Sequence, residues 1–243
     1  MFDTHIHVHR LEAAEHYVEP CLVPAINEED WSQMLQLRKT HPHLWLAMGV
    51  HPQHVDGWNE KTSEYLSALL ENPAVIAVGE IGLDKRVAVP FELQERVLRC
   101  QLRLAVACGK PVVLHAVRSY DRLLPLLEEE QIARVGGVVH GFYGSVEVAL
   151  QLEQLNLAIG VGRLILDPAA KKLPEVVQAV AQHSLLVETD APWREAQDDW
   201  CRCWQEIADQ VARLRGWHRA LAVRVTDENA RRIFRLPQER NVE

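Results

Sequence analysis

Four side chains that can exchange protons or bind metal ions alternate at the start of the chain. The segment FDTHIHVH carries Asp3, His5, His7 and His9 at every second position. Every second side chain of an extended strand lies on the same face, so these four are expected to share one. A buried imidazole needs a partner for its ring nitrogens or loses its charge, and a metal ion supplies such a partner. The spacing therefore favours a metal site over an exposed edge strand.

Further residues of the same chemical kind stand at the ends of apolar, strand-like runs. They are Glu80 in AVGEIGLD, His115 in VVLHAV, His140 in VVHGF and Asp190 in LLVETDAP. In a parallel barrel the carboxyl ends of the strands meet at one mouth, where active sites of this architecture lie. We therefore expect one opening to be surrounded by His5, His7, Glu80, His115, His140 and Asp190.

The number and type of these six residues indicate the chemistry. A single zinc-like ion needs three or four protein ligands, whereas six ligands with one bridging carboxylate suit two ions. Mixed nitrogen and oxygen ligands are compatible with magnesium, manganese, iron or zinc. Two divalent ions can lower the pKa of a water and hold a phosphoryl oxygen at the same time, so the set predicts hydrolysis.

The elements that would position these residues are short apolar runs separated by amphipathic stretches. Eight runs are expected to be strands: 2–8, 16–26, 44–51, 75–83, 111–117, 136–142, 157–162 and 184–192. Alternation of strands and helices predicts a parallel sheet, and eight repeats predict closure into a (β/α)₈ TIM barrel. The chain has 243 residues and no linker-like stretch, which predicts a single domain over 1–243.

The first crossover is expected to be exceptional, because only residues 9–17 separate the first two runs. As a helix they would span roughly 13 Å, less than the roughly 17 Å of a typical strand that the connection must retrace. We therefore predict an extended connection or a one-turn stub in place of the first helix. This would leave a thin patch on the barrel wall that a second subunit could cover.

Composition and charge narrow the function classes. A formal net charge of −8 disfavours broad attraction to nucleic acid, although a local cleft can oppose the overall sign. No apolar run approaches the roughly 20 residues of a membrane span, and the first residues do not read as a signal peptide, which predicts a cytoplasmic protein with no membrane partner. The five cysteines are expected to be reduced, and the pair Cys201 and Cys203 falls in a helical pattern that does not suit a metal site.

The motifs, taken in order, resemble the TatD family of metal-dependent deoxyribonucleases. The similar segments are DTHIH at the start, GVHP at 49–52, GEIGLD at 79–84, PVVLH at 111–115, VVHGFYGS at 138–145, ETDAP at 188–192 and ENARRIF at 228–234. They run nearly end to end. The resemblance implies a TIM-barrel, metal-dependent hydrolase, specifically a 3′ to 5′ exonuclease acting on DNA ends.

The resemblance also implies roles for individual residues. His5, His7 and Asp190 would bind one divalent ion, His115 and His140 the second, and Glu80 would bridge the two. Glu80 and Asp190 would thus be catalytic, with Asp190 accepting a proton from the attacking water. His51 matches a family position near the substrate phosphate.

The chain also departs from the family pattern, most clearly in a missing first helix and a short loop after ETDAP. Candidate substrate contacts near that loop and beyond other strands are Trp193, which could stack on a base, and Arg118 and Arg163, whose guanidinium groups suit phosphate. Among the other polar residues, Asp3 is expected to orient a ligand histidine and His9 to lie at the surface. Glu188 and Asp84 are not expected to be ligands.

Three alternative functions follow from the same residues. An amidohydrolase-like C–N or lactone hydrolase would use a similar set of histidines with a strand-eight aspartate, but a carbamylated lysine is frequent there at the end of the fourth strand, where this chain has Glu80. A small phosphoester hydrolase would suit a mouth with a trimmed loop. A non-enzymatic, partner-binding barrel is disfavoured because a scaffold has no need of an unpaired cluster of buried charge. The chain is expected to act as a monomer or homodimer.

Overall fold

The core of the protein is a curled parallel sheet whose strands follow one another in chain order. In a computed structural model, which describes residues 1–12, 14–192 and 199–236, each strand pairs in parallel with the next. The strands are β1 (Cys21–Pro24), β2 (Leu44–Met48), β3 (Val75–Asp84), β4 (Val112–Val117), β5 (Gly137–Val139), β6 (Leu157–Val161) and β7 (Leu185–Val187). The predicted TIM-barrel fold class is confirmed.

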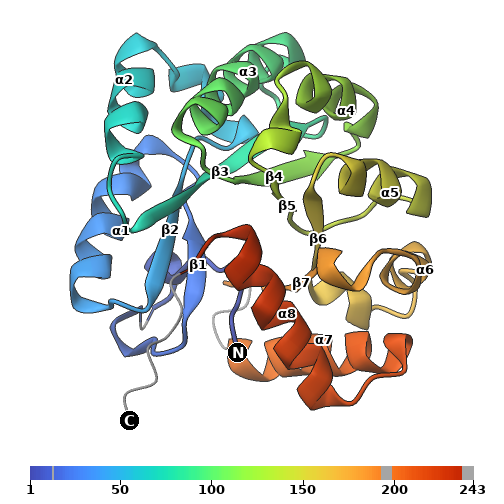
Figure 1. The fold of residues 1–243 in the computed structure, drawn as a ribbon. Coiled ribbons are helices and arrows are strands. Elements are labelled where there is room, and N and C mark those ends of the chain that lie inside the picture. Colours follow the sequence, from blue (N-terminus) through green and yellow to red (C-terminus); the bar gives the residue numbers. More distant parts are fainter. Residues whose placement is uncertain (13, 193–198, 237–243) are drawn as a thin grey trace.

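Helices cover the outside of this sheet (Figure 1). The α-helices are α1 (Glu28–Thr40), α2 (Glu60–Leu69), α3 (Phe91–Cys108), α4 (Tyr120–Glu129), α5 (Val146–Gln154), α6 (Lys172–Ala179), α7 (Trp200–Arg215) and α8 (Arg219–Ile233). Short 3₁₀ helices are η1 (Val8–Arg10), η2 (Ala14–His16), η3 (Pro52–Gly57), η4 (Ile132–Arg134), η5 (Arg163–Leu166) and η6 (Gln182–Ser184). Within the described residues, no helix has the length and apolar character needed to cross a membrane.

The prediction of a regular strand at residues 2–8 is wrong, but the segment lies where the predicted strand would lie in the barrel. It makes only an isolated bridge, between Asp3 and Cys21, and it turns into η1 at Val8. The N–H of Thr4 donates to the carbonyl of Val187 at 3.2 Å, and that of Ile6 to Leu22, also at 3.2 Å. The segment therefore lies between β7 and β1, where an eighth strand would stand. Its ladder is interrupted because the carboxylate of Asp3 takes the N–H of His5 at 3.1 Å.

The predicted short first crossover is confirmed. The described residues between His7 and Cys21 form no helix longer than the three-residue turns η1 and η2. Part of the thin wall is covered by the chain itself, because the ring of Tyr17 lies 4.4 Å from the ring of Trp200 at the start of α7. That a second subunit covers the remainder stays a prediction.

The expectation that His9 lies at the surface is wrong. His9 is buried, with 5% of its surface exposed, and its Nε2 lies 3.4 Å from Asp30. Asp30 also receives two hydrogen bonds of 2.9 Å from Arg10 and one of 2.8 Å from the N–H of Ile26. The burial follows from the short crossover, which folds back as one 3₁₀ turn onto the N-terminus of α1. Asp30 thus fixes the segment that carries the first two histidines.

The N-terminal segment and each of the seven strands contribute one residue to a layer that fills the interior of the barrel below the mouth. This layer consists of Phe2, Leu22, Ala47, Ala77, Val113, Val138, Ala158 and Leu186. The C-terminal end of α8 and the residues that follow pack against it with Ala230, Ile233, Phe234 and Leu236. The barrel is therefore a filled core whose one free end is the mouth.

A bulge in β3 aims Glu80 into the mouth. Val78 pairs with Val112 but Ile81 pairs with Leu114, so β3 has one residue more than β4 over this stretch. Ala77 and Glu80 consequently share the inner face although they are three residues apart. Gly79 stands at this point because a Cβ there would lie 2.6 Å from the Cβ of Val113.

We expect Asp30→Asn to destabilise the protein by about 2 kcal/mol at neutral pH, because it weakens charge-assisted bonds to His9 and Arg10. Burial raises the pKa of Asp30, but His9, the N–H of Ile26 and Arg10 together hold it below its usual value. A depressed folded-state pKa contributes stability above the unfolded value and loses it as pH falls. The stability difference from wild type should therefore shrink below about pH 4.

Thermal and urea unfolding between pH 3 and 8 would measure this difference. Glu29→Gln, which changes an exposed carboxylate in the same helical turn, is the matched control. Equal loss from both variants, or a loss from Asp30→Asn that does not depend on pH, would contradict the assignment.

Candidate metal centre

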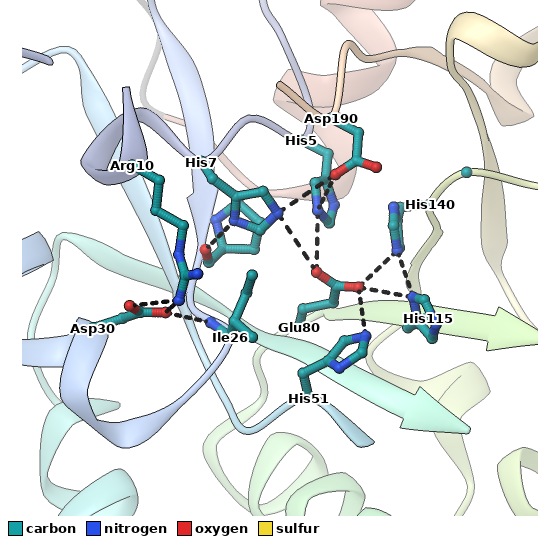
Figure 2. A network of polar contacts seen from close by, with 12 residues as sticks. His5, His7, Arg10, Ile26, Asp30, His51, Glu80, His115, His140 and Asp190 are labelled. Carbon is teal, nitrogen blue, oxygen red and sulfur yellow. Dashed lines mark hydrogen bonds and ion pairs between the residues drawn. The ribbon is translucent and has the colours of Figure 1, made fainter. Parts of the chain in front are cut away.

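The carboxylate of Glu80 stands at the middle of the mouth, with imidazoles on both sides (Figure 2). Its Oε2 lies 3.3 Å from Nε2 of His5 and 3.8 Å from Nε2 of His7. Its Oε1 lies 2.9 Å from Nδ1 of His115 and 2.8 Å from Nε2 of His140. Each oxygen of one carboxylate thus faces a different pair of histidines.

Asp190 completes the side that carries the first two histidines. Its Oδ1 lies 3.5 Å from Nε2 of His5 and 3.4 Å from Nε2 of His7. Its backbone is in the left-handed region, with φ of 56°, which aspartate tolerates better than most residues. The N–H of Asp190 donates to the carbonyl of His5 at 2.8 Å, and the N–H of His7 to Ala191 at 2.7 Å. The two ligand-bearing segments are therefore held together through their backbones.

All six predicted ligands are brought together, in overlapping groups whose donor atoms lie close enough to share an ion. The groups are His5, His7 and Asp190; His5, Glu80 and His140; and His51, Glu80 and His115. His51 joins the third group with its Nε2 3.5 Å from Oε1 of Glu80. Its Nδ1 accepts the N–H of Gln53 at 3.1 Å, so the neutral ring carries its hydrogen on Nε2. That tautomer makes His51 a hydrogen-bond donor into the mouth.

The residues present fit a divalent metal centre. His5 is fully buried, and neither of its ring nitrogens has a hydrogen-bond partner within the described residues. Nε2 of His5 instead points between two carboxylates, the arrangement expected of a ligand. Imidazole and carboxylate together suit zinc, manganese and related divalent ions.

Two histidines are oriented by partners on the side away from Glu80. Nδ1 of His7 lies 3.0 Å from the carbonyl of Pro24, and Nε2 of His115 lies 3.1 Å from Oδ2 of Asp84. Such partners fix the ring orientation and raise the basicity of a metal-binding histidine. Asp84, which sequence reasoning set aside as a non-ligand, is therefore a positioning residue. Its signal in the sequence was its place at the end of the family-like motif GEIGLD at 79–84.

Asp3 positions the first ligand segment through the backbone rather than through a ring. Its Oδ1 accepts the N–H of His5 and that of Thr189, each at 3.1 Å, and its Oδ2 accepts the Thr189 hydroxyl at 2.6 Å. Burial raises the pKa of Asp3 to about 7. The expectation that Asp3 supports a ligand histidine agrees with these contacts, although its bonds reach both halves of the site.

The electrostatics of the site depend on Glu80. Burial would raise the pKa of Glu80, but the imidazoles around it, His140 first, hold it well below its usual value. Burial opposes charge on His140 too, yet Glu80 raises the pKa of that histidine to about 10. His5 has the opposite outcome, because burial lowers its pKa to about 4. A neutral His5 can offer a lone pair to a metal ion without first losing a proton.

A pocket of about 270 Å³ opens beside His115, His140 and Asp190. Arg163, a predicted phosphate contact, lines it, and so does Arg86, which sequence reasoning missed. Arg118 is exposed and is not among the described residues that line this pocket, and Trp193 lies outside the described residues. The only signal for Arg86 was its position two residues beyond β3.

The floor of this pocket contains a further acidic residue. Glu188 is fully buried, and it accepts a hydrogen bond from the N–H of Gly141, next to His140. Burial raises its pKa to about 8. Gly160 faces it, and a Cβ at that glycine would lie 2.4 Å from Oε2 of Glu188. Glu188 therefore holds the turn after His140 in place, and it belongs to none of the candidate ligand groups among the described residues.

Comparison with known proteins agrees with this geometry. A family profile described as TatD related DNase matches residues 2–235. The chain belongs to this family. The predicted resemblance is thereby confirmed, and with it the coarser prediction of a metal-dependent hydrolase whose candidate ligands are the His, Glu and Asp groups described above.

Individual TatD relatives differ in how much is known of them. The uncharacterized metal-dependent hydrolase YjjV of Escherichia coli (strain K12) is 41% identical over 183 residues, covering 74% of this chain and 70% of that protein. The 3′-5′ ssDNA/RNA exonuclease TatD of Edwardsiella piscicida is 34% identical over 228 residues, covering 88% and 87%. The crystal structure of YjjV, a TatD homologue from Escherichia coli K12, superposes with a TM-score of 0.86 over 98% of both chains at 33% identity.

We expect Asp84→Asn to weaken binding of one metal ion about 10- to 100-fold, because His115 would lose the carboxylate that orients it. Isothermal titration of metal-free protein with manganese or zinc would measure the affinity. Asp121→Asn, which changes an exposed carboxylate paired with Lys85, is the control. Unchanged affinity in Asp84→Asn would show that the 3.1 Å contact does not orient His115.

Proposed function

We propose that this chain is a two-metal phosphodiesterase that removes nucleotides from the 3′ ends of DNA. The observation that carries the proposal is the position of Glu80, whose two oxygens face two separate groups of ligands. One ion would be held by His5, His7 and Asp190, the other by His115 and His140, with Glu80 shared between them. Magnesium, manganese and zinc are the candidate ions.

The chemistry then divides between the ions and the chain. Two bound divalent ions would supply an acidified water and neutralise charge on a phosphoryl group. Asp190 is placed to accept a proton, since its side chain is 31% exposed at the mouth. Burial would raise its pKa, but a hydrogen bond with His7 and the nearby imidazoles hold it below its usual value, so Asp190 is ionised at neutral pH.

His51 would serve as a donor to a substrate phosphate. Burial lowers its pKa to about 3, so the ring is neutral at physiological pH. Its hydrogen-bearing Nε2 lies 3.5 Å from Glu80 in the middle of the mouth. A neutral hydrogen-bond donor there would stabilise negative charge that develops on the phosphate. It would do so without placing a further positive charge beside the two ions.

Nucleic acid as substrate is supported by relatives whose printed name is 3′-5′ ssDNA/RNA exonuclease TatD. Of the substrate contacts predicted from the sequence, Arg163 lines the pocket, whereas a phosphate contact by Arg118 and base stacking by Trp193 stay predictions. A cytoplasmic location, a single domain over 1–243 and a monomeric or homodimeric state stay predictions from the sequence.

Cleavage of a 5′-labelled single-stranded DNA oligomer tests the proposal. Metal-free protein resupplied with magnesium, manganese or zinc should produce a ladder that shortens from the 3′ end. Asp190→Asn should lower the rate at least about 100-fold, because it removes both a ligand and the proton acceptor. A ladder of equal intensity in this variant would implicate a contaminating nuclease. No cleavage with any metal, in protein that binds two ions, would redirect the search to small phosphoesters and to amide or lactone bonds.

We expect Glu80→Gln to reduce the metal content from two ions per chain to one or none, because an amide bridges two cations poorly. Elemental analysis after dialysis would give the stoichiometry. Circular dichroism serves to confirm that the variant is folded. Two ions retained in folded Glu80→Gln would contradict the bridging role.

A further inference from the structure

An exposed aromatic side chain follows the pocket-lining residues His140, Gly141 and Phe142 in the loop after β5. Tyr143 lies four residues beyond the end of β5 and three beyond His140, and 64% of its surface is exposed. Its neighbour Phe142 is 1% exposed, with its ring 5.6 Å from that of Tyr120. The loop thus buries one aromatic ring and presents the next to solvent.

The loop that presents Tyr143 is held by two backbone N–H groups. The N–H of Phe142 donates to the carbonyl of Gly160 in β6 at 3.1 Å, and the N–H of Gly141 donates to the buried carboxylate of Glu188. These bonds join the loop to β6 and to the residue that follows β7. Because the backbone is fixed, an exposed ring at this point can act as a preformed platform, which loses little entropy on binding.

Two guanidinium groups lie at the adjoining pocket. Arg86 and Arg163 line it together with the ligands His115, His140 and Asp190, and Phe142 forms part of its wall. The side chain of Arg86 is 62% exposed, and its Nε stays 3.8 Å from Asp84, which leaves it accessible to a ligand. At about 270 Å³ the pocket is slightly below the usual range for small-molecule sites. It is therefore suited to one nucleotide unit rather than to a length of duplex.

We propose that Tyr143 stacks on a base near the 3′ end of a single strand while Arg86 and Arg163 contact the neighbouring phosphates. The inference rests on the proposed function, because it names the part of a nucleic acid that this mouth recognises. Base stacking on an aromatic ring is largely independent of sequence, and guanidinium groups fit phosphate oxygens. Bases in a duplex already stack on each other, so this arrangement selects unpaired ends.

The aromatic contact is tested with two oligomers of equal length and charge, one carrying thymine bases and one abasic. Fluorescence anisotropy with metal-loaded protein, using phosphorothioate linkages to slow hydrolysis, gives both dissociation constants. Tyr143→Ala should weaken binding of the base-bearing oligomer about fivefold or more and leave the abasic oligomer unchanged. Tyr143→Phe should bind both oligomers as wild type does, because the ring is retained.

The phosphate contacts have a different signature. Arg86→Gln and Arg163→Gln should each weaken both oligomers equally. Each should also reduce the slope of log affinity against log salt by about 0.7, the value for one phosphate contact on a single strand. Arg224→Gln, which changes an arginine that is 68% exposed on α8, is the matched control and should change neither quantity.

The outcomes separate this inference from the proposed function. Base-dependent binding lost in Tyr143→Ala, in protein that shortens no oligomer, would support the inference and refute the exonuclease. Shortening of DNA with unchanged binding by Tyr143→Ala would retain the exonuclease and overturn the stacking role. Equal weakening by Tyr143→Phe and Tyr143→Ala would also overturn it, because a hydroxyl contact would then explain the loss.

Discussion

One buried negative charge organises the mouth of this barrel. Glu80 lies among His5, His140, His115 and His51, with its oxygens between 2.8 and 3.5 Å from their ring nitrogens. An isolated carboxylate in such a place would cost several kcal/mol, so its surroundings must compensate it. The imidazoles do so in part, and His5, whose ring nitrogens have no hydrogen-bond partner within the described residues, offers a nitrogen to a cation that would complete the compensation. The site is therefore suited to binding positive charge, such as metal ions, that the chain itself does not supply.

Three irregular features of the chain serve this carboxylate and its neighbours. The bulge in β3 turns Glu80 inward, Asp190 takes a left-handed backbone, and Asp3 ties the N-terminal segment to the segment after β7. Each feature is unfavourable in a regular barrel strand. Each nevertheless occurs where the side chain of a candidate metal ligand must point into the mouth. The interior layer below, made of ordinary apolar residues, supplies the rigidity that holds these features in place.

The clustering of the candidate ligands could be predicted because each polar residue follows an apolar run, and parallel strands bring such ends together. The hydrophobic pattern of the sequence could not reveal features that depend on the local conformation of the backbone. Strict alternation would place Glu80 on the opposite face from Ala77, and only the extra residue in β3 reverses this. The first segment reads as a strand, but the side chain of Asp3 competes for the N–H of His5. The burial of His9 could not be predicted, because it depends on a contact with Asp30, which is distant in sequence. Arg86 carries no sequence pattern, since exposed arginines are common beyond strands.

Because the protein as a whole is negatively charged, the few basic groups at the mouth are important for binding a phosphate backbone. With a net charge of −8, most of the surface repels a phosphate backbone. Arg86 and Arg163 line the pocket beside the candidate ligands, where they supply local positive charge. For the proposed substrate, the interior of a long strand gains little from contact with the acidic surface, whereas an end that enters the mouth meets guanidinium groups, an aromatic ring and cations together. The acidic surface would repel the interior of a strand, and the basic groups at the mouth would attract its end. Both effects would thus favour ends over interior linkages.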